Sequence, residues 1–279
     1  MDVNWNIKSY CVCQENGSKN TDFKLNIAYK NEKVFKNYEG ILIYKCLNCG
    51  VLKTIPDKNV KLVQESRFEY YEKNKKKFVE IFKPIVETIK KYKKNVQVLD
   101  VGCSSGILLE MLKRQGFNIY GLEPDKKAYI RAKKKFKNKI FNCKLQDFLR
   151  TNRLKFDVII YNHVLEHIQN PIIELKLVKK ALKSNGIFVL GLPNTSNIFF
   201  WLRKKYWESL MPNEHIWHFS KKQIIKLLKR NRYKVIDVNF SNDKRLDYSY
   251  IKRMYFSFLS LINNIFKTGE SILIVCKKV

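Results

Sequence analysis

The sequence predicts an α/β fold in which helices cover both faces of one mostly parallel sheet. From Val96 onward, short β-branched runs alternate with amphipathic segments to the end of the chain, and this alternation is typical of a doubly wound sheet. The first run passes directly into a turn of small residues, 102–106, and then into a helix. Open α/β sheets bind ligands at the carboxyl ends of their strands, so this turn is the first candidate for a binding site.

The sequence divides into three zones, of which this core is the last. Residues 1–60 carry four cysteines and short strand-like runs, which predict a small β module. Residues 61–94 have apolar side chains at three- and four-residue spacing and predict helix, with Pro84 as a break between two segments. The core, 96–279, completes a second domain that we place at 61–279.

Further strands and helices follow in alternation within this core. Asn170 before Pro171 and Ser220 before an amphipathic run are typical helix starts. The predicted strands are 96–101, a run ending at Glu123, 140–143, a run beginning at Phe156, 186–191, 233–238 and 271–276, and the predicted helices include 171–183 and 220–230.

The turn at 102–106 is the most informative stretch of the chain. Gly102 has no Cβ, so the backbone can turn sharply and approach a ligand closely. A dinucleotide fingerprint would also require glycine at positions 104 and 107, but the chain has Ser104 and Ile107 there. The sequence therefore excludes a dinucleotide fingerprint at this turn.

The pattern Asp100-x-Gly102-x-x-x-Gly106 instead resembles motif I of the class I methyltransferases that use S-adenosylmethionine (SAM). The resemblance implies that the turn, including Cys103, makes room for the methionine part of SAM. It also implies that Asp100 orients the SAM amine. In that family the fold is Rossmann-like, with seven strands in the order 3-2-1-4-5-7-6 and the final strand antiparallel.

Five further residues match later positions of the same family. Glu123, followed by Pro124, comes about 20 residues after the turn, where an acid can accept hydrogen bonds from two ribose hydroxyls. Asp147 resembles the position that meets the adenine amino group. Asn162 and His163 follow the fourth strand and complete the residues that we expect to bind SAM.

The loop after the fourth strand resembles that of the ubiquinone-biosynthesis O-methyltransferases. In those enzymes the loop reads Glu-x-x-Glu-His and holds a divalent cation. Here His163 replaces the first acid, which leaves Glu166 and His167. Both remain candidates for catalysis, although they can equally cap the following helix and brace the loop.

A second histidine pair lies between the fifth strand and the next helix. The run His215-Ile-Trp-His218-Phe-Ser resembles a His-x-x-His-Phe-Ser/Thr signature of the small-molecule branch of the family. Imidazole suits general-base work near neutral pH. Either His215 or His218 can serve as the base, and the alternative is that one of them only holds the loop by hydrogen bonding.

The N-terminal cysteines have the form of a zinc knuckle. Cys46 and Cys49 are three residues apart, and Gly50 after them tolerates a positive φ. Cys11 and Cys13 lie upstream, and the four together resemble the zinc ribbon that precedes many methyltransferases of this branch. The first pair has one residue fewer than the usual Cys-x-x-Cys, so a knuckle that packs without metal is the alternative. A disulfide is disfavoured in a reducing cytoplasm.

The formal net charge is +30, but the excess is mostly lysine spread along every predicted helix. This pattern indicates a solvated surface and no specific nucleic-acid partner. The chain shows no signal peptide and no apolar run long enough to span a bilayer, so we predict a cytoplasmic protein. Residues 251–266 are apolar with basic flanks. This stretch predicts peripheral contact with an anionic membrane, a dimer interface or a buried helix.

Together these motifs predict a SAM-dependent methyltransferase for a small-molecule or sugar acceptor. Methylation of oxygen is favoured, in cell-surface glycan or secondary metabolism. An RNA methyltransferase, suggested only by charge, and a SAM-fold binding module without catalysis are the alternatives. The oligomeric state has no signal in the sequence.

Overall fold

The larger sheet of the protein has the predicted doubly wound topology. The computed structural model describes residues 6–14, 20–28, 41–56, 68–242 and 249–279. Seven strands form the order β11-β12-β9-β8-β5-β6-β7, and β12 is antiparallel to both of its neighbours. They are β5 (Gln97–Val101), β6 (Asn118–Leu122), β7 (Ile140–Phe141), β8 (Phe156–Asn162), β9 (Leu182–Pro193), β11 (Tyr233–Ser241) and β12 (Ser271–Lys278). Counted along the chain, this is 3-2-1-4-5-7-6, so the prediction is confirmed.

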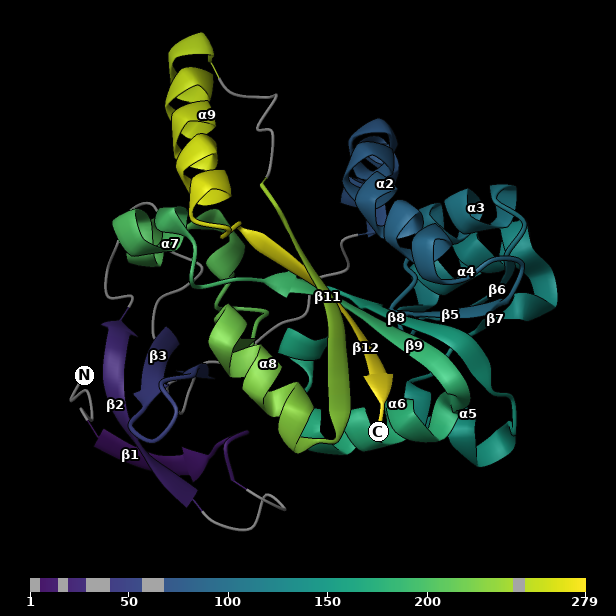
Figure 1. The fold of residues 1–279 in the computed structure, drawn as a ribbon, viewed down its shortest axis with the longest axis horizontal. Coiled ribbons are helices and arrows are strands. Elements are labelled where there is room, and N and C mark those ends of the chain that lie inside the picture. Colours follow the sequence, from purple (N-terminus) through teal and green to yellow (C-terminus); the bar gives the residue numbers. More distant parts are fainter. Residues whose placement is uncertain (1–5, 15–19, 29–40, 57–67, 243–248) are drawn as a thin grey trace.

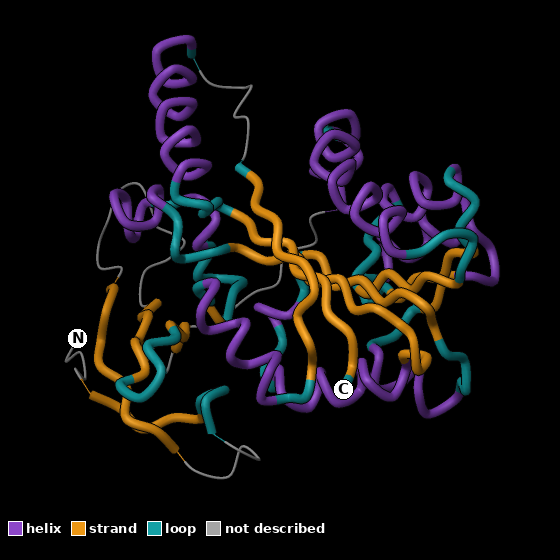
Figure 2. The backbone as a smooth tube through the Cα atoms, viewed as in Figure 1, coloured by secondary structure: helices purple, strands orange, loops and turns teal. Residues whose placement is uncertain are grey.

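Helices cover both faces of this sheet (Figures 1 and 2). On one face lie α2 (Lys75–Tyr92), α3 (Ile107–Arg114) and α4 (Lys126–Phe136), and on the other α5 (Leu145–Thr151), α6 (Pro171–Ala181) and α8 (Lys221–Arg230). Consecutive strand residues therefore enter different cores: Val98 packs with α2 and α3, whereas Leu99 packs with α5 and α6. Both residues are fully buried, as expected for central strands of a parallel sheet.

The helix starts follow the predicted caps. The Asn170 side chain accepts a hydrogen bond from the Ile173 amide, with Pro171 at the first helical position. Ser220 and Gln223 form a reciprocal capping box at the start of α8. These side chains satisfy amides that the first helical turn leaves without partners.

The predicted break at Pro84 is wrong. Pro84 lies inside α2, and the interruption falls at Asn74, between α1 (Phe68–Lys73) and α2. Pro84 is on the exposed side of α2, where water can solvate the carbonyl that loses its amide partner. The buried face, with Phe82, Ile85 and Ile89, continues past it. Residues 61–67 of the predicted helical zone lie outside the described residues.

The N-terminal β module has five strands, and one of them comes from the second predicted domain. The sheet order is β1-β2-β3-β4-β10, with β1 (Asn6–Tyr10), β2 (Asn20–Ala28), β3 (Ile41–Cys46), β4 (Leu52–Pro56) and β10 (Trp217–His218). Trp217 pairs with Lys53 and His218 with Leu52. Phe23 and Tyr44 join the same hydrophobic core as α5, α6 and α8. A domain boundary near residue 60 remains a prediction, and this strand pairing crosses it.

Two further helices lie at the carboxyl edge of β9. α7 (Ile198–Arg203) follows this strand, and α9 (Tyr250–Ile265) precedes β12 and extends away from the sheet (Figure 1). Among the described helices, none combines the length and the apolar character that crossing a membrane requires.

Candidate active site

The glycine turn lies at the carboxyl end of β5, in the centre of the sheet. Gly102, Ser104 and Gly106 have φ values of 74°, 47° and 81°, which strongly favour glycine at the first and last of these positions. A Cβ on Gly102 would lie 2.8 Å from the Val164 side chain, and one on Gly106 would overlap the Phe136 ring. The turn therefore packs closely against both the loop after β8 and helix α4.

Two carboxylates flank this turn from neighbouring strands. Asp100 in β5 pairs in register with Gly121 of β6, just before Glu123, and both carboxylates are buried. Glu123 accepts hydrogen bonds from the backbone amides of Ser104, at 2.7 Å, and Asp125, at 2.8 Å. Each of its oxygens keeps further lone pairs for a ligand hydroxyl. Glu123 thus fixes the turn to β6 and can still bind a ribose.

Burial controls the protonation of this site. Burial raises the pKa of Asp100 to about 8, with the negative charge of Glu123 as the second cause. Burial also raises the pKa of Glu123, although the amides of Asp125 and Ser104 oppose this shift. A cationic ligand amine beside Asp100 would favour its charged form and reverse the effect.

A narrow cavity lies at the glycine turn and includes Asp100, but not Glu123, in its lining. Gly102, Cys103 and Ser104 of the turn line it together with Asn162 of β8. Tyr71 of α1 and Phe82 of α2 also line it. The helical spacing of residues 61–94 predicts an apolar face that includes these two aromatic residues, but it gives no sign of a cavity.

Not every predicted cofactor residue faces this cavity. Pro124 is exposed, and its carbonyl accepts a hydrogen bond from Asn142. Asp147 lies in the first turn of α5, with its side chain 55% exposed and 3.7 Å from the Arg150 guanidinium. The structure therefore joins Asp100, the glycine turn and Glu123 on neighbouring strands, with Asn162 lining the same cavity. The role of Asp147 at the adenine remains a prediction.

The loop after β8 gathers a carboxylate and three imidazoles. Glu166 is almost fully buried, and neither of its oxygens has a hydrogen-bond partner among the described residues. His163 Nδ1 lies 3.2 Å and His215 Nε2 3.9 Å from Glu166 Oε1. The rings of His167 and His215 meet edge to face, with centroids 4.7 Å apart. Ligand atoms of Glu166, His167 and His215 lie within 4.8 Å of one another, so the group has the spacing of a cation site as well as of a proton relay.

His167 has a defined tautomer in this cluster. Its Nδ1 lies 3.0 Å from the backbone carbonyl oxygen of Glu214. A carbonyl only accepts hydrogen bonds, so Nδ1 carries the proton and Nε2 of the neutral ring keeps a lone pair. The acceptor nitrogen of a neutral His167 ring is therefore directed away from the Glu214 carbonyl.

His218 occupies a different environment from the other histidines. Its Nε2 lies 2.8 Å from the Thr54 hydroxyl on strand β4. Burial lowers the pKa of His218 to about 3, with His167 as the second cause. A base of such low pKa is a poor proton acceptor at neutral pH, so this geometry favours a positioning role that ties the site to the N-terminal sheet.

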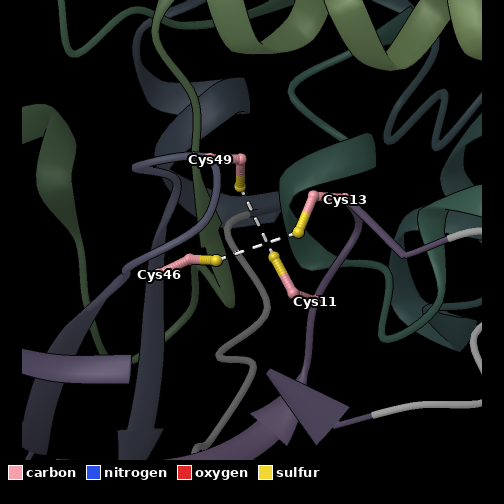
Figure 3. Close-up of side chains that lie close together, drawn as sticks. All are labelled: Cys11, Cys13, Cys46 and Cys49. Carbon is pink, nitrogen blue, oxygen red and sulfur yellow. Dashed lines mark hydrogen bonds between the residues drawn. The ribbon is translucent and has the colours of Figure 1, made fainter. Parts of the chain in front are cut away.

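The four cysteines converge at one point between two chain segments (Figure 3). Cys11 Sγ lies 3.6 Å from Cys49 Sγ, and Cys13 Sγ lies 3.8 Å from Cys46 Sγ. Four sulfurs around a tetrahedral zinc at 2.3 Å would be separated by about 3.8 Å, so the group fits a zinc ion. Within the group, hydrogen bonds from the Cys11 and Cys49 thiols lower the pKa of Cys46, whereas the pKa of Cys11 is raised by its hydrogen bonds to Cys46 and Cys49 and by burial.

Side chains of α8 hold this knuckle in place. Arg230 donates a hydrogen bond to the Cys13 carbonyl at 2.7 Å, and Gln223 donates one to the Cys49 carbonyl at 3.3 Å. Gly50 has a φ of 75°, as predicted for the residue after the knuckle. The cysteine cluster is therefore fixed to a helix of the larger sheet.

The chain is similar to known methyltransferases. A family model described as a methyltransferase domain matches residues 63–238. The ubiquinone biosynthesis O-methyltransferase of Pelagibacter ubique is 31% identical over 166 residues, which are 56% of this chain and 69% of that protein. Other curated relatives with this name match over 33% to 49% of their own length.

Solved structures share the fold. A SAM-dependent methyltransferase from Archaeoglobus fulgidus superimposes with a TM-score of 0.57 at 17% identity, over 77% of this chain and 100% of that one. A plantazolicin methyltransferase solved with S-adenosylhomocysteine gives a TM-score of 0.52 at 15% identity, over 76% of this chain and 88% of that one.

The chain belongs to the methyltransferase domain family, and it is a SAM-dependent methyltransferase. The residues present fit this cofactor. Asp100 is a buried carboxylate whose raised pKa a ligand cation would relieve. Glu123 offers acceptors for hydroxyls, and the glycine turn brings backbone close to both. SAM supplies an electrophilic methyl group when bound here, and Asp100, Glu123 and Asn162 are the residues that would hold it.

Proposed function

We propose that this protein methylates an oxygen atom of a small molecule or sugar, and that His167 accepts the proton of the acceptor hydroxyl. The methyltransferase class follows from the family, and the choice of oxygen is supported by the name of the relative from Pelagibacter ubique. Acceptors from cell-surface glycan or secondary metabolism fit this proposal.

The observation that carries the proposal is the buried carboxylate of Glu166, which makes no hydrogen bond among the described residues and lies 3.2 Å from His163 and 3.9 Å from His215. Val164, two residues earlier, contacts the glycine turn at Gly102, so the cluster lies at the edge of the sheet that binds SAM. A negative charge beside imidazoles stabilises the imidazolium that forms when a proton is taken up. The Glu166 carboxylate therefore favours proton uptake by a neighbouring imidazole.

Within the cluster, His167 has the geometry of the base. Its acceptor nitrogen, Nε2, is set by the bond from Nδ1 to the Glu214 carbonyl. His215 packs against its ring and serves as a positioning residue. Bound SAM would supply its methyl group to the acceptor hydroxyl and leave as S-adenosylhomocysteine, and His167 would take up the hydroxyl proton.

We also propose that Cys11, Cys13, Cys46 and Cys49 hold a structural zinc ion. Their sulfur–sulfur distances match tetrahedral coordination. A closed site of four thiolates has no open position for substrate, so the ion would stabilise the fold and take no part in methyl transfer.

A labelling experiment distinguishes a small-molecule methyltransferase from an RNA methyltransferase and from a binding module without catalysis. The purified protein is incubated with methyl-labelled SAM and either a nucleic-acid-free metabolite extract or total RNA, and products are identified by mass spectrometry. We expect label in small molecules that gain one CH2 group, attached through oxygen. Label in RNA contradicts the proposal, as does a protein that binds SAM but labels neither fraction.

A further inference from the structure

The described chain concentrates its exposed apolar side chains on one surface, formed by α7 and α9. In α9 alone, Ile251 is 80% exposed and Phe258 61% exposed, and Trp201 of α7 is 69% exposed. The full set, which we call the α7–α9 surface, is Trp201, Leu202, Tyr206, Tyr250, Ile251, Met254, Tyr255, Phe258, Leu261, Ile265 and Phe266. Isolated exposed hydrophobic residues are normal, but a concentration of them on two helices that pack against each other indicates a contact surface.

Helix α9 is not a buried core helix, because it presents separate faces to the protein and to its surroundings. Phe256, Leu259 and Asn263 are buried. Phe256 stacks on Phe199 of α7 at 5.5 Å, and Asn263 accepts a hydrogen bond from the Ile198 amide. The outward apolar stripe recurs at three- and four-residue spacing through residues 251, 254, 258, 261 and 265, which places these side chains on one side of the helix.

Within the two segments that form this surface, every charged residue is basic. Residues 198–206 and 250–267 contain no Asp or Glu. Their exposed basic side chains include Lys204, Arg253 and Lys267. Of the nearby acids, Glu208 is paired with Arg203. The surface therefore combines apolar side chains with cations, and adds Trp and Tyr, which favour the boundary between lipid and water.

We propose that the α7–α9 surface docks onto an anionic lipid bilayer. Apolar side chains on one helix face with flanking cations suit the headgroup region of such a membrane. A second copy of the chain fits less well, because a two-fold interface would place the same cations opposite themselves. A nucleic acid offers phosphates for the lysines but no apolar partner for Met254 or Phe258.

The docked surface would share an edge of the sheet with the active site. α7 follows the carboxyl end of β9, and Ser271 at the start of β12 pairs with Pro193 at that same end. The glycine turn and the Glu166 loop follow the carboxyl ends of β5 and β8. Docking would thus bring the catalytic edge of the sheet near the membrane. The docking proposal depends on the exposure and charge of the α7–α9 surface and does not depend on the proposed oxygen acceptor.

Vesicle flotation tests this proposal with the full chain. We expect binding to mixed phosphatidylcholine–phosphatidylglycerol vesicles, and at least about tenfold weaker binding to phosphatidylcholine alone, since each basic residue near an anionic surface contributes. The double variant Met254→Gln/Phe258→Gln should weaken binding to the mixed vesicles by at least about tenfold, because two large side chains no longer enter the lipid.

A matched control removes two exposed apolar side chains from elsewhere. Ile130 and Ile173 are 44% and 51% exposed on α4 and α6, so Ile130→Gln/Ile173→Gln should float like wild type. Equal loss of binding in both double variants overturns the proposal, and so does binding that ignores anionic lipid. Failure of wild type to float also overturns it. If flotation fails and the protein instead forms a dimer that only the α9 variant disrupts, the occupant is a second copy of the chain.

Discussion

The glycine turn and the histidine cluster lie at the same edge of the sheet but are built in different ways. Asp100, Gly102 and Glu123 lie on two consecutive strands and their turns, and backbone amides hold Glu123 in place. The histidine cluster joins the loop after β8 to a segment 47 residues later. Its neighbour His218 is anchored to β4. Methyl-donor binding should therefore be separable from turnover.

Replacing the proposed base should have the largest effect. His167→Ala should lower kcat by about 10²–10⁴, because a positioned proton acceptor contributes this much. SAM affinity, measured by calorimetry, should change little, since His167 is hydrogen-bonded to the Glu214 carbonyl and holds neither Asp100 nor Glu123 in place. His215→Ala should have a smaller effect on kcat, as expected for a residue that only positions the ring. A His167 variant with normal turnover would point to Glu166 or water as the acceptor.

Removing a cysteine tests whether the distant module supports the site. Cys46→Ser should release about one zinc per chain and lower the free energy of unfolding by several kcal/mol, because metal binding and folding are coupled. Zinc content and thermal denaturation measure the two effects. Cys143→Ser, outside the cluster, is the control. Wild-type protein without zinc, and with the stability of the variant, would identify a knuckle that packs without metal.

On the cofactor side, Glu123→Ala should weaken binding of both SAM and S-adenosylhomocysteine. Loss of a charge-assisted hydrogen bond costs about 1.5–3 kcal/mol, which is roughly a 10- to 150-fold change in Kd. Because Glu123 also binds the amides of Ser104 and Asp125, Glu123→Gln is the gentler comparison. The kcat at saturating SAM should fall less than in His167→Ala. The reverse order would contradict the separation of the two regions.

The smallest effect concerns His218 and appears in the pH dependence of stability. Its pKa is about 3 in the folded protein and about 6.5 in an unfolded chain. Below pH 6.5 the unfolded state therefore takes up a proton that the folded state does not. The contribution of neutral His218 to the free energy of unfolding is fully present above pH 6.5 and is lost as the pH falls toward 3. Between pH 8 and pH 5 it amounts to about 2 kcal/mol.

His218→Gln should remove this slope. Denaturant unfolding of wild type and variant at several pH values between 8 and 5 gives the comparison. The variant should lose less stability than wild type over this range, whatever its stability at pH 8. Parallel curves would show that His218 is accessible to protons in the folded state.

Several parts of the site followed directly from local patterns. The glycine spacing of Gly102 and Gly106, and the acid Glu123 after the next strand, predicted a turn that the structure confirms. The helix caps at Asn170 and Ser220 were also predicted from the sequence and are confirmed. In each case the determining contacts are between residues close in sequence, and short-range geometry leaves few alternatives.

By itself, the sequence determined the doubly wound sheet, the family and the cysteine pairs. The tertiary structure decided that helix α2 continues through Pro84, because its buried face outweighs one lost hydrogen bond on the solvent side. It also decided that Tyr71 and Phe82 line the cavity, that β10 joins the N-terminal sheet, and that Glu166 is buried beside imidazoles from two segments. These features depend on contacts between segments far apart in the chain. Their burial and register follow from how whole layers pack, which no local pattern records.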